Sequence, residues 1–148
     1  MEVTREVLLS CLAVPRWADE VLAGRPYTNA AGVLAAAARA SRDLTDKELV
    51  QALSGHPRIG EHGGAQSRNE QSGIDLAVDG TAARLAAGNA AYEERFNRVF
   101  IIRAAGRDGE EILSELERRL HNDDAAERAE TIESLRQIAL LRLEAALS

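Results

Sequence analysis

Apolar residues in this chain recur at intervals of three or four positions, and this spacing restricts the fold more than any other feature. It is clearest in two segments, at Ile112, Leu113, Leu116 and Leu120, and again at Ile132, Leu135, Ile138, Ala139 and Leu143. Residues spaced in this way lie on one face of an α-helix. No segment shows the sustained apolar–polar alternation of a half-buried strand. The sequence therefore predicts an all-α fold.

The composition agrees with this prediction. Of the 148 residues, 45% are hydrophobic and only 3% aromatic, with alanine and leucine prominent, and these two residues favour helix over strand. A charged fraction of 28% is typical of a globular chain rather than a disordered one. We find no internal repeat or composition shift that would mark a boundary. We therefore expect a single domain over residues 1–148, an irregular bundle of about eight helices.

Capping residues mark several helix starts. Pro15 suits the first turn of a helix, and Asn29 is a plausible N-cap for "AAGVLAAAARA". Thr45 and Glu48 have the spacing of a capping box, and Asp108 likewise precedes the helix "EEILSELERRL", after which His121 is expected at a helix end.

The predicted bounds are as follows. The first helix runs from Thr4 to Val14, another resumes near Ser67, a long one runs from Thr81 to about Ala105, and the last runs from about Asp124 to Leu147. Gly88 in the long helix costs about 1 kcal/mol relative to alanine unless a neighbour packs closely there.

Charge and hydropathy exclude several classes of protein. The formal net charge of −6 argues against nucleic acid as a partner, because such a domain normally carries a basic face. No apolar run approaches the roughly 20 residues that span a bilayer, and no secretory signal is evident. The one cysteine, Cys11, lies in an apolar run and is expected to be a small core residue. We expect a cytoplasmic protein with no membrane partner.

One linker concentrates chemically active side chains. It is "HPRIGEHGGAQSRNEQ", residues 56–71, and it contains two of the three histidines. Pro57 biases His56 toward extended backbone, so His56 can point its imidazole into a cleft. Histidine titrates near neutral pH, which suits proton transfer. A capping or half-buried loop histidine is the alternative interpretation.

The end of this linker also has two interpretations. Ser67 and Glu70 have the spacing of a capping box, which alone requires no function. A helix N-terminus also gathers unpaired N–H groups and partial positive charge, which favour an anionic ligand. Glu70 would then hydrogen-bond a histidine or a substrate hydroxyl, and Gln71 would bind an amide through its donor and acceptor groups.

A metal site is a further alternative. His56, Glu61 and His62 are suitable ligand types for zinc. Their spacing is not that of a helical histidine pair, and two glycines follow directly, so we expect no metal. A metal-assisted hydrolase remains the hypothesis that metal analysis would test.

Two arginines lie among apolar residues. Arg103 interrupts "FIIRAAG", which the helical pattern assigns to the buried end of the long helix, and Arg142 is flanked by leucines. Each is either a snorkelling or ion-paired arginine, or a bidentate clamp for a carboxylate.

Five blocks, in order, resemble a known family. They are "GHPRIGE", "SRNEQSG", "NAAYEERFNRVFIIRAAGR", "ILSELERRLHND" and "IALLRL", and the resemblance as a whole runs from about Val14 to Leu143. Together they resemble the 2-oxo-4-hydroxy-4-carboxy-5-ureidoimidazoline (OHCU) decarboxylase family of urate degradation. A His-Pro motif alone would be weak, but five ordered blocks are specific.

The resemblance implies an all-α enzyme without metal or organic cofactor, often a homodimer, which converts OHCU to (S)-allantoin after urate oxidase and hydroxyisourate hydrolase have acted. It implies that His56 is the catalytic acid or base and that Glu70 assists it. The substrate-binding residues that it implies are Pro57, Ser67, Gln71, Phe100, Ile102, Arg103, Ala104 and Arg142.

Three features depart from the family pattern. Arg58 stands where many members have an acidic residue, Arg103 stands where a small residue is common, and the loop 60–66 is compact. An inward-pointing Arg103 would change the charge of the pocket. The alternative function, from another class, is a catalytically inactive helical relative that serves in binding or dimerisation.

Overall fold

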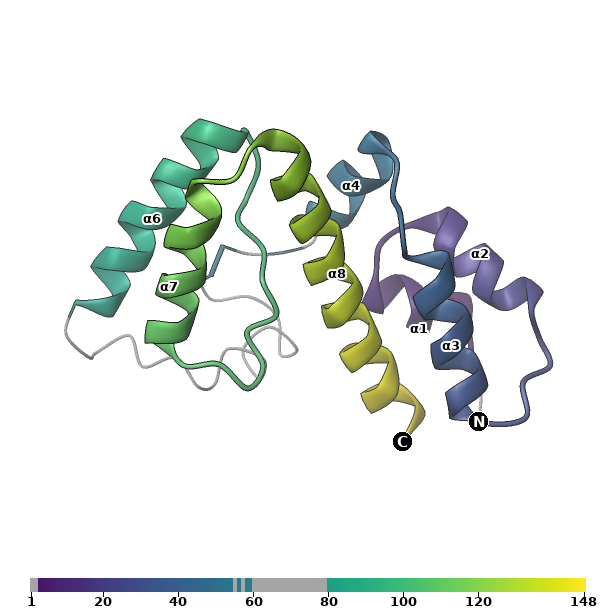
Figure 1. Ribbon diagram of the computed structural model, residues 1–148. Helices are drawn as coiled ribbons and strands as arrows, with labels where there is room; N and C mark the ends of the chain where they lie inside the picture. Colours follow the sequence, from purple (N-terminus) through teal and green to yellow (C-terminus); the bar gives the residue numbers. More distant parts are fainter. Residues whose placement is uncertain (1–2, 55, 57, 60–79) are drawn as a thin grey trace. The chain divides into compact units, whose positions relative to one another are not determined.

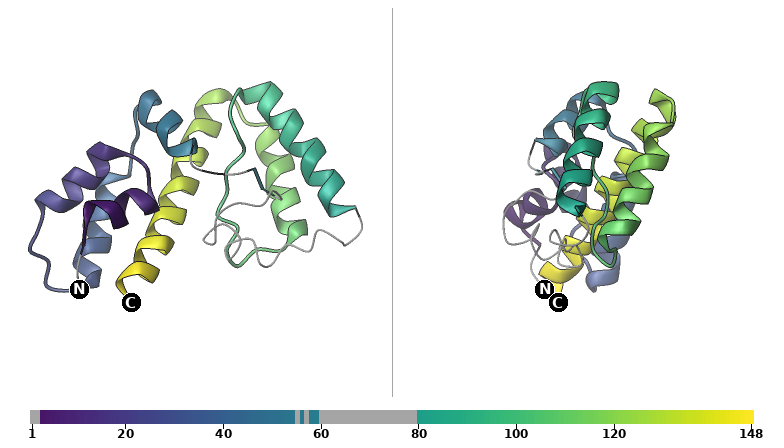
Figure 2. Two further views of the ribbon diagram at one scale, coloured as in Figure 1. Left: turned by 180° about the vertical axis from the view of Figure 1, so that it is seen from behind. Right: turned by 90° about the vertical axis from the view of Figure 1, so that its left-hand side faces the viewer.

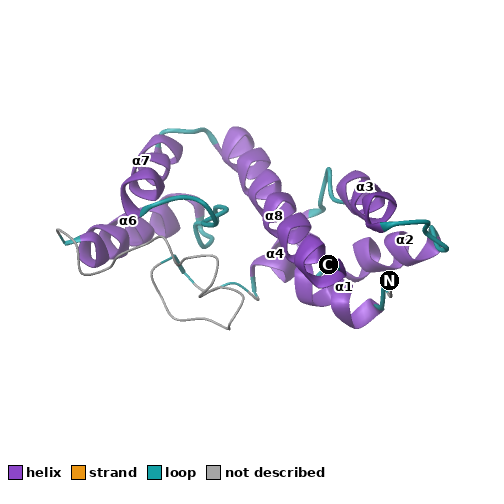
Figure 3. Cartoon of the chain, turned by 90° about the horizontal axis from the view of Figure 1, so that it is seen from below, coloured by secondary structure: helices purple, strands orange, loops and turns teal. Residues whose placement is uncertain are grey.

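The computed structural model describes residues 3–54, 56, 58–59 and 80–148, and this part of the chain is entirely helix and loop. Figure 3 shows helices joined by loops, with no strand in the part that it colours by structure. The all-α prediction is confirmed. Seven helices lie within the described residues, and the predicted helix near Ser67 lies outside them.

The contacts divide the chain into two compact units. Unit 1 comprises Met1–Gly55 and Ile132–Ser148, and unit 2 comprises His56–Thr131. Unit 1 contains helices α1 (Arg5–Cys11), α2 (Pro15–Ala23), α3 (Ala30–Ala40) and α4 (Asp46–Leu53), whereas α6 (Thr81–Phe96) and α7 (Gly109–Leu120) belong to unit 2; α8 (Asp124–Leu147) contributes residues to both (Figure 1). A single domain over residues 1–148 stays a prediction.

The predicted capping residues are in place. The Asn29 side chain accepts a hydrogen bond from the Gly32 N–H at 3.0 Å, and Pro15 is the first residue of α2. At α4, the Glu48 N–H donates to Thr45 Oγ1 and the Thr45 N–H donates to Glu48 Oε1, which completes the capping box. These side chains satisfy N–H groups that a helix start leaves without backbone partners. Local sequence therefore fixes these helix starts.

A buried tryptophan and a half-exposed arginine hold unit 1 together. Trp17 is fully buried and donates from its indole N–H to the Ala37 carbonyl at 2.9 Å, so α2 packs against α3. Arg16 donates to Glu48 Oε2 at 2.8 Å and to the Ala40 carbonyl at 2.9 Å. The hydrogen bond from Arg16 to Glu48 also holds the pKa of Glu48 below its usual range. Arg16 thus ties α2 to α4 and to the end of α3.

In unit 2, α6 and α7 lie side by side (Figures 1 and 2). Their shared core contains the large buried residues Leu85, Tyr92, Phe96, Phe100, Ile112 and Leu116. Gly88 allows the close approach, because a β-carbon at that position would overlap the Leu116 side chain. Leu116 is therefore the closely packed neighbour that explains a glycine within α6.

The long helix ends earlier than its pattern predicts. We expected helix from Thr81 to about Ala105, but α6 stops at Phe96, and Asn97 adopts a left-handed backbone with φ 57°. Asparagine tolerates this conformation, which commonly ends helices. The residues 98–104 that follow are not helical, so the assignment of "FIIRAAG" to a buried helix end was wrong in its secondary structure.

The other bounds differ less. The first helix ends at Cys11 rather than Val14, because Leu12 already has extended backbone. The predicted bounds of the last helix are confirmed, as is the burial of Cys11. None of the helices in the described residues has the length and the apolar character needed to cross a bilayer.

Candidate functional site

His56 lies just beyond the end of α4, whose last residue is Leu53 and whose C-cap is Ser54. It is not helical and is half-buried. This agrees with the prediction that it follows a helix end, and half-burial leaves part of the imidazole accessible. Its proposed partners Pro57, Ser67, Glu70 and Gln71 lie outside the described residues, as do Glu61 and His62 of the alternative metal site.

Two anchors attach the residues after His56 to α6. Arg58 donates twice to the Glu93 carboxylate, from Nε at 2.7 Å and from Nη2 at 2.8 Å. This pairing holds the pKa of Glu93 below its usual range. The Ile59 carbonyl accepts a hydrogen bond from Asn89 Nδ2 at 3.0 Å. Arg58, which departs from the family pattern, thus has a structural partner on α6.

A pocket of about 500 Å³ lies between these anchors and α6. Arg58 and Ile59 form one side of it, and the other side is a face of α6 that includes Leu85, Asn89 and Glu93. Asn89 is buried, and its Oδ1 accepts no hydrogen bond from the described residues. The pocket therefore offers a mostly apolar wall with one buried acceptor.

The segment Phe100–Ala104 lies in the loop that connects α6 to α7. Phe100, Ile101, Ile102 and Ala104 are each at most 4% exposed. The Phe100 ring packs edge-on against Tyr92, with ring centroids 5.2 Å apart. Arg103 is half-buried, and its Nε makes no hydrogen bond within the described residues. Four of the predicted substrate-binding residues thus lie within one five-residue segment, and three of them are buried.

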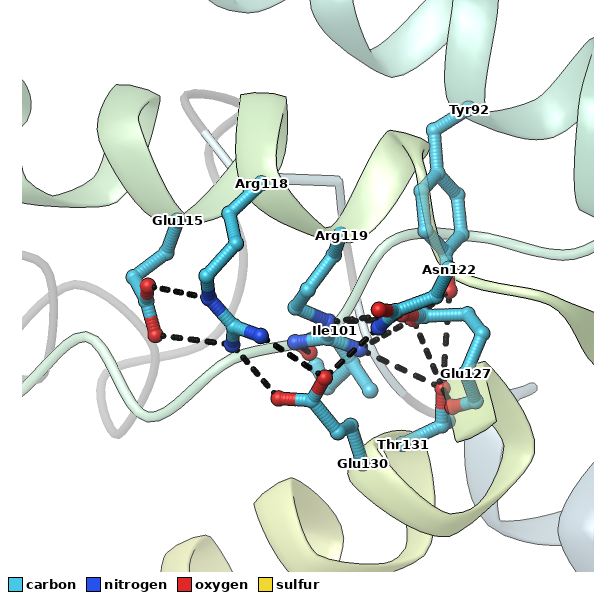
Figure 4. Close-up of polar contacts among 9 residues, drawn as sticks. All are labelled: Tyr92, Ile101, Glu115, Arg118, Arg119, Asn122, Glu127, Glu130 and Thr131. Atoms are coloured by element: carbon cyan, nitrogen blue, oxygen red, sulfur yellow. Dashed lines mark hydrogen bonds and ion pairs between the residues drawn. The ribbon is translucent and has the colours of Figure 1, made fainter. Parts of the chain in front are cut away.

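A buried ion pair supports this segment from α7 and α8 (Figure 4). Arg119 and Glu127 are 1% and 0% exposed, and Arg119 Nε lies 3.0 Å from both carboxylate oxygens. Arg119 Nη1 donates to the Ile101 carbonyl at 2.8 Å, and its guanidinium lies 4.7 Å from the centroid of the Phe100 ring. The Arg119 guanidinium therefore bonds to buried groups of the protein, the Glu127 carboxylate and the Ile101 carbonyl.

Tyr92 completes this network. Its hydroxyl donates to Glu127 and lies 3.4 Å from the Thr131 hydroxyl. Burial, and after it the hydrogen bond to Glu127, raises the pKa of Tyr92 above its usual range. The phenol therefore stays protonated and serves as a donor to the carboxylate.

A second, exposed network flanks the buried one. Arg118 bridges Glu115 and Glu130, with Nη2 2.6 Å from Glu130 Oε1, and its side chain is 49% exposed. The guanidinium holds the pKa of both carboxyls below their usual range. Exposed pairs of this kind stabilise weakly. Arg118 and Arg119 are adjacent, but they differ in burial and in their partners. Arg118 is exposed and bonds to two carboxylates, whereas Arg119 is buried and also bonds to the Ile101 carbonyl.

Arg142 lies on α8 within unit 1 and is half-buried, whereas His56 belongs to unit 2. Of the ten predicted site residues, the structure describes six, and four of these lie together in the segment 100–104. Within the described residues, no three histidine, cysteine or acidic side chains are grouped to hold a metal ion.

The sequence analysis missed the Arg119–Glu127 pair, although a signal was present. Arg119 falls three residues after Leu116, in phase with the apolar face of α7. Glu127 lies four residues before Thr131 and eight before Leu135, in phase with the apolar face of α8. A charged residue in phase with each of two apolar faces indicates a buried pair, because an unpaired buried charge is costly.

The sequence model of the OHCU decarboxylase family matches residues 2–144. One curated relative, the "2-oxo-4-hydroxy-4-carboxy-5-ureidoimidazoline decarboxylase" of Amia calva, is 45% identical over 82 residues, which are 54% of this chain and 47% of the relative. The "Uric acid degradation bifunctional protein" of Bacillus sp. (strain TB-90) is 21% identical over 131 residues, 86% of this chain and 26% of the relative. The chain therefore spans about half or less of these relatives.

Solved structures agree in fold. A crystal structure of OHCU decarboxylase in the presence of (S)-allantoin superposes with a TM-score of 0.83 at 21% identity, covering 97% of this chain and 98% of the other. A crystal structure of (S)-allantoin synthase gives a TM-score of 0.70 at 17% identity, covering 97% of this chain and 49% of the other. Since the family model covers nearly the whole sequence, the chain belongs to the OHCU decarboxylase family.

Proposed function

We propose that this protein decarboxylates OHCU to (S)-allantoin without a metal or organic cofactor, as a carboxy-lyase of urate degradation. The observation that carries the proposal is the family match over residues 2–144. The name of the Amia calva relative describes this activity, and a solved structure of this fold is of OHCU decarboxylase in the presence of (S)-allantoin. The half-buried position of His56 after α4 is compatible with proton transfer at an accessible imidazole.

The substrate itself makes the reaction feasible. Its carboxylate and hydroxyl share one carbon, which is next to a ring C=N that accepts electrons. When the bond to the carboxylate breaks, CO2 leaves and the electron pair moves into the ring toward that nitrogen, which takes a proton. The hydroxyl then loses its proton to become a carbonyl, and the neighbouring carbon gains a proton on one face. A site must therefore orient the carboxylate and control three proton transfers: to the ring nitrogen, from the hydroxyl and to the neighbouring carbon.

Each predicted residue has a role in this scheme. We assign proton transfer to His56, and to Glu70 the orientation and charge of that imidazole; a positioned acid or base typically contributes about 10²–10⁴-fold. Arg142 would hold an anionic or carbonyl group through its planar donors. Pro57 would direct His56 into the site.

The remaining residues would bind the edges of the substrate. Ser67 and Gln71 offer side-chain hydrogen bonds to the ureido group, and backbone groups of Phe100, Ile102, Arg103 and Ala104 would line the ring. The burial of the segment 100–104 supports this role, because pairing in a water-poor site strengthens hydrogen bonds.

We also infer that the protein works as a cytoplasmic homodimer, with the products of urate oxidase and hydroxyisourate hydrolase as the source of its substrate. The name of the Bacillus relative describes uric acid degradation, and the one cysteine among the 148 residues excludes an intramolecular disulfide. Light scattering on a size-exclusion column tests the oligomeric state, and a monomeric mass would contradict the homodimer.

Circular dichroism of a reconstituted urate reaction tests the activity. Urate oxidase and hydroxyisourate hydrolase generate OHCU, and the reaction is followed with and without this protein. We expect faster loss of the OHCU signal and accumulation of optically active allantoin. An unchanged slow decay to racemic product would instead indicate a catalytically inactive relative with a binding or dimerisation role. Chelator-sensitive activity with stoichiometric zinc would support the metal-assisted alternative.

A further inference from the structure

Arg119 contacts the backbone of the segment Phe100–Ala104 at the Ile101 carbonyl. Arg119 Nη1 donates to this oxygen at 2.8 Å, and the donor is 1% exposed. Its guanidinium also lies over the Phe100 ring, 4.7 Å from the centroid. One side chain therefore holds both a peptide group and the ring that precedes it.

Holding the Ile101 carbonyl also fixes the Ile102 N–H. The two groups belong to the same planar peptide, and in a trans peptide the C=O and the N–H point in opposite directions. Arg119 thereby directs the Ile102 N–H away from itself. Ile102 is 4% exposed, and no described residue accepts a hydrogen bond from its N–H. Buried backbone N–H groups are nearly always paired, so this amide suits an acceptor on a ligand.

Glu127 holds Arg119 in place. The carboxylate accepts from Arg119 Nε, and Tyr92 donates to the same carboxylate from the opposite side. Thr131 Oγ1 accepts from Arg119 Nη2 at 3.3 Å and lies one turn along α8 from Glu127. All four residues are buried (Figure 4), so the guanidinium has little freedom to move.

We propose that Arg119, held by Glu127, is a positioning residue for the decarboxylation: it fixes the direction of the Ile102 N–H, which then binds an acceptor atom of the substrate. This inference rests on the proposed function. Arg119 itself does not touch the substrate, because Glu127, Ile101 and Thr131 engage its guanidinium. The carbonyl groups of a ureide are the matching acceptors.

The test needs a variant that folds. Arg119→Met alone leaves the Glu127 carboxylate buried without its cation, which strongly destabilises a protein. The double variant Arg119→Met/Glu127→Gln removes both charges, so that no unpaired charge is left buried. The amide introduced at position 127 still accepts from Tyr92. The Ile101 carbonyl loses its donor, and Thr131 Oγ1 loses the longer bond, of 3.3 Å, from Arg119 Nη2.

The neighbouring ion pair between Arg118 and Glu130 provides a matched control. Arg118→Met/Glu130→Gln removes the same two charges from the same two helices, one residue away on α7. Arg118, however, is 49% exposed, and its guanidinium bonds to Glu115 and Glu130. This control pair separates loss of an ion pair between α7 and α8 from loss of the contact with Ile101.

Two readouts distinguish positioning from general stability. In the buried-pair variant without substrate, we expect the ¹⁵N order parameter of the Ile102 amide to fall from about 0.85 to below about 0.6. In steady state, we expect its KM for OHCU to rise about tenfold with kcat little changed, since uniform binding is lost. The control variant should match the wild type in both readouts.

The outcomes separate this inference from the proposed function. A folded Arg119→Met/Glu127→Gln protein with a rigid Ile102 amide and wild-type KM would overturn the positioning role, even if the wild type is an active decarboxylase. Wild-type protein without decarboxylase activity would overturn the proposed function. The order parameter, measured without substrate, then decides whether Arg119 fixes the amide.

Discussion

Asn89 on α6 donates a hydrogen bond from its side-chain amide to the carbonyl of Ile59, at 3.0 Å and 30 residues earlier in the chain. Ile59 is buried and lies three residues after His56. Through this bond, a buried side chain of α6 fixes the position of the backbone three residues after the proposed catalytic histidine. The adjacent pair Arg58–Glu93 adds a second attachment to the same helix.

Replacing Asn89 tests the first attachment. In Asn89→Ala, the buried Ile59 carbonyl loses its donor, and we expect the free energy of unfolding to fall by about 1–3 kcal/mol. Urea titration followed by circular dichroism measures this. Glu93→Gln, one turn along α6, weakens only the partly exposed pair and should cost less than about 1 kcal/mol. Equal losses in the two variants would contradict the importance of the Ile59 contact.

Replacing His56 tests the proposed acid or base. His56→Gln keeps hydrogen-bonding capacity but cannot transfer protons near neutral pH, so we expect kcat to fall about 10²–10⁴-fold. Thermal unfolding should be little changed, because His56 is only half-buried. The matched control is His121→Gln, an exposed C-cap residue of α7, which should keep wild-type kcat. Loss of folding in His56→Gln, with normal activity in the folded fraction, would make His56 structural.

Gly88 allows α6 and α7 to approach, and a pair of substitutions tests this. Gly88→Ala gains about 1 kcal/mol of helix propensity, but its methyl group overlaps the buried Leu116 side chain, and overpacking costs about 1–3 kcal/mol. We expect net destabilisation in urea titrations. With Leu116→Ala as the background, the overlap is gone, and the same Gly88→Ala change should stabilise. The same sign in both backgrounds would exclude the proposed overlap.

Acid should weaken unit 1 through Glu48. The hydrogen bond from Arg16 lowers the pKa of Glu48 below its ordinary value of 4.5 in the folded protein. Between the folded pKa and 4.5, the unfolded chain binds more protons, so stability rises with pH there. The stabilisation is complete above about pH 5 and is lost as pH falls through the folded pKa.

We therefore expect Glu48→Gln to be less stable than the wild type at pH 7, with the difference shrinking by pH 3. Urea titrations at several pH values measure this. Asp19→Asn serves as the comparison, because Asp19 is 62% exposed and pairs with Arg5, whose side chain is 52% exposed. A Glu48→Gln difference that stays constant from pH 7 to pH 3 would contradict the role of the carboxylate.

Helix starts were predictable because their signals are local. Asn29, Thr45 and Asp108 cap helices through side-chain bonds to N–H groups three residues on, and short sequence patterns identify them. The end of α6 was not predicted, because Tyr92, Phe96 and Phe100 keep a helical period although only the first two are in the helix. Phe100 instead reaches the same core from the loop after α6. Asn97, a residue that tolerates left-handed backbone, was the overlooked signal.

The candidate site likewise has features that the sequence predicts and features that only the tertiary structure shows. The pattern of the linker identified His56 as a residue after a helix end, and its chemistry came from the family resemblance. The pairing of Arg119 with Glu127 and of Asn89 with Ile59 depends on tertiary packing, which spacing along one helix does not determine. A charged residue in phase with the apolar face of a helix is predicted to be buried, but only the tertiary structure identifies its partner.

The segment Phe100–Ala104 is a stretch of loop backbone inside a helical protein. Backbone groups that lack partners and are exposed, as at the edge of a sheet, are a template for pairing with other chains and for aggregation. Here four of the five residues are buried, and a guanidinium takes the place of a backbone donor at the Ile101 carbonyl. The fold thereby keeps a non-helical backbone segment in its interior, shielded from pairing with another protein chain.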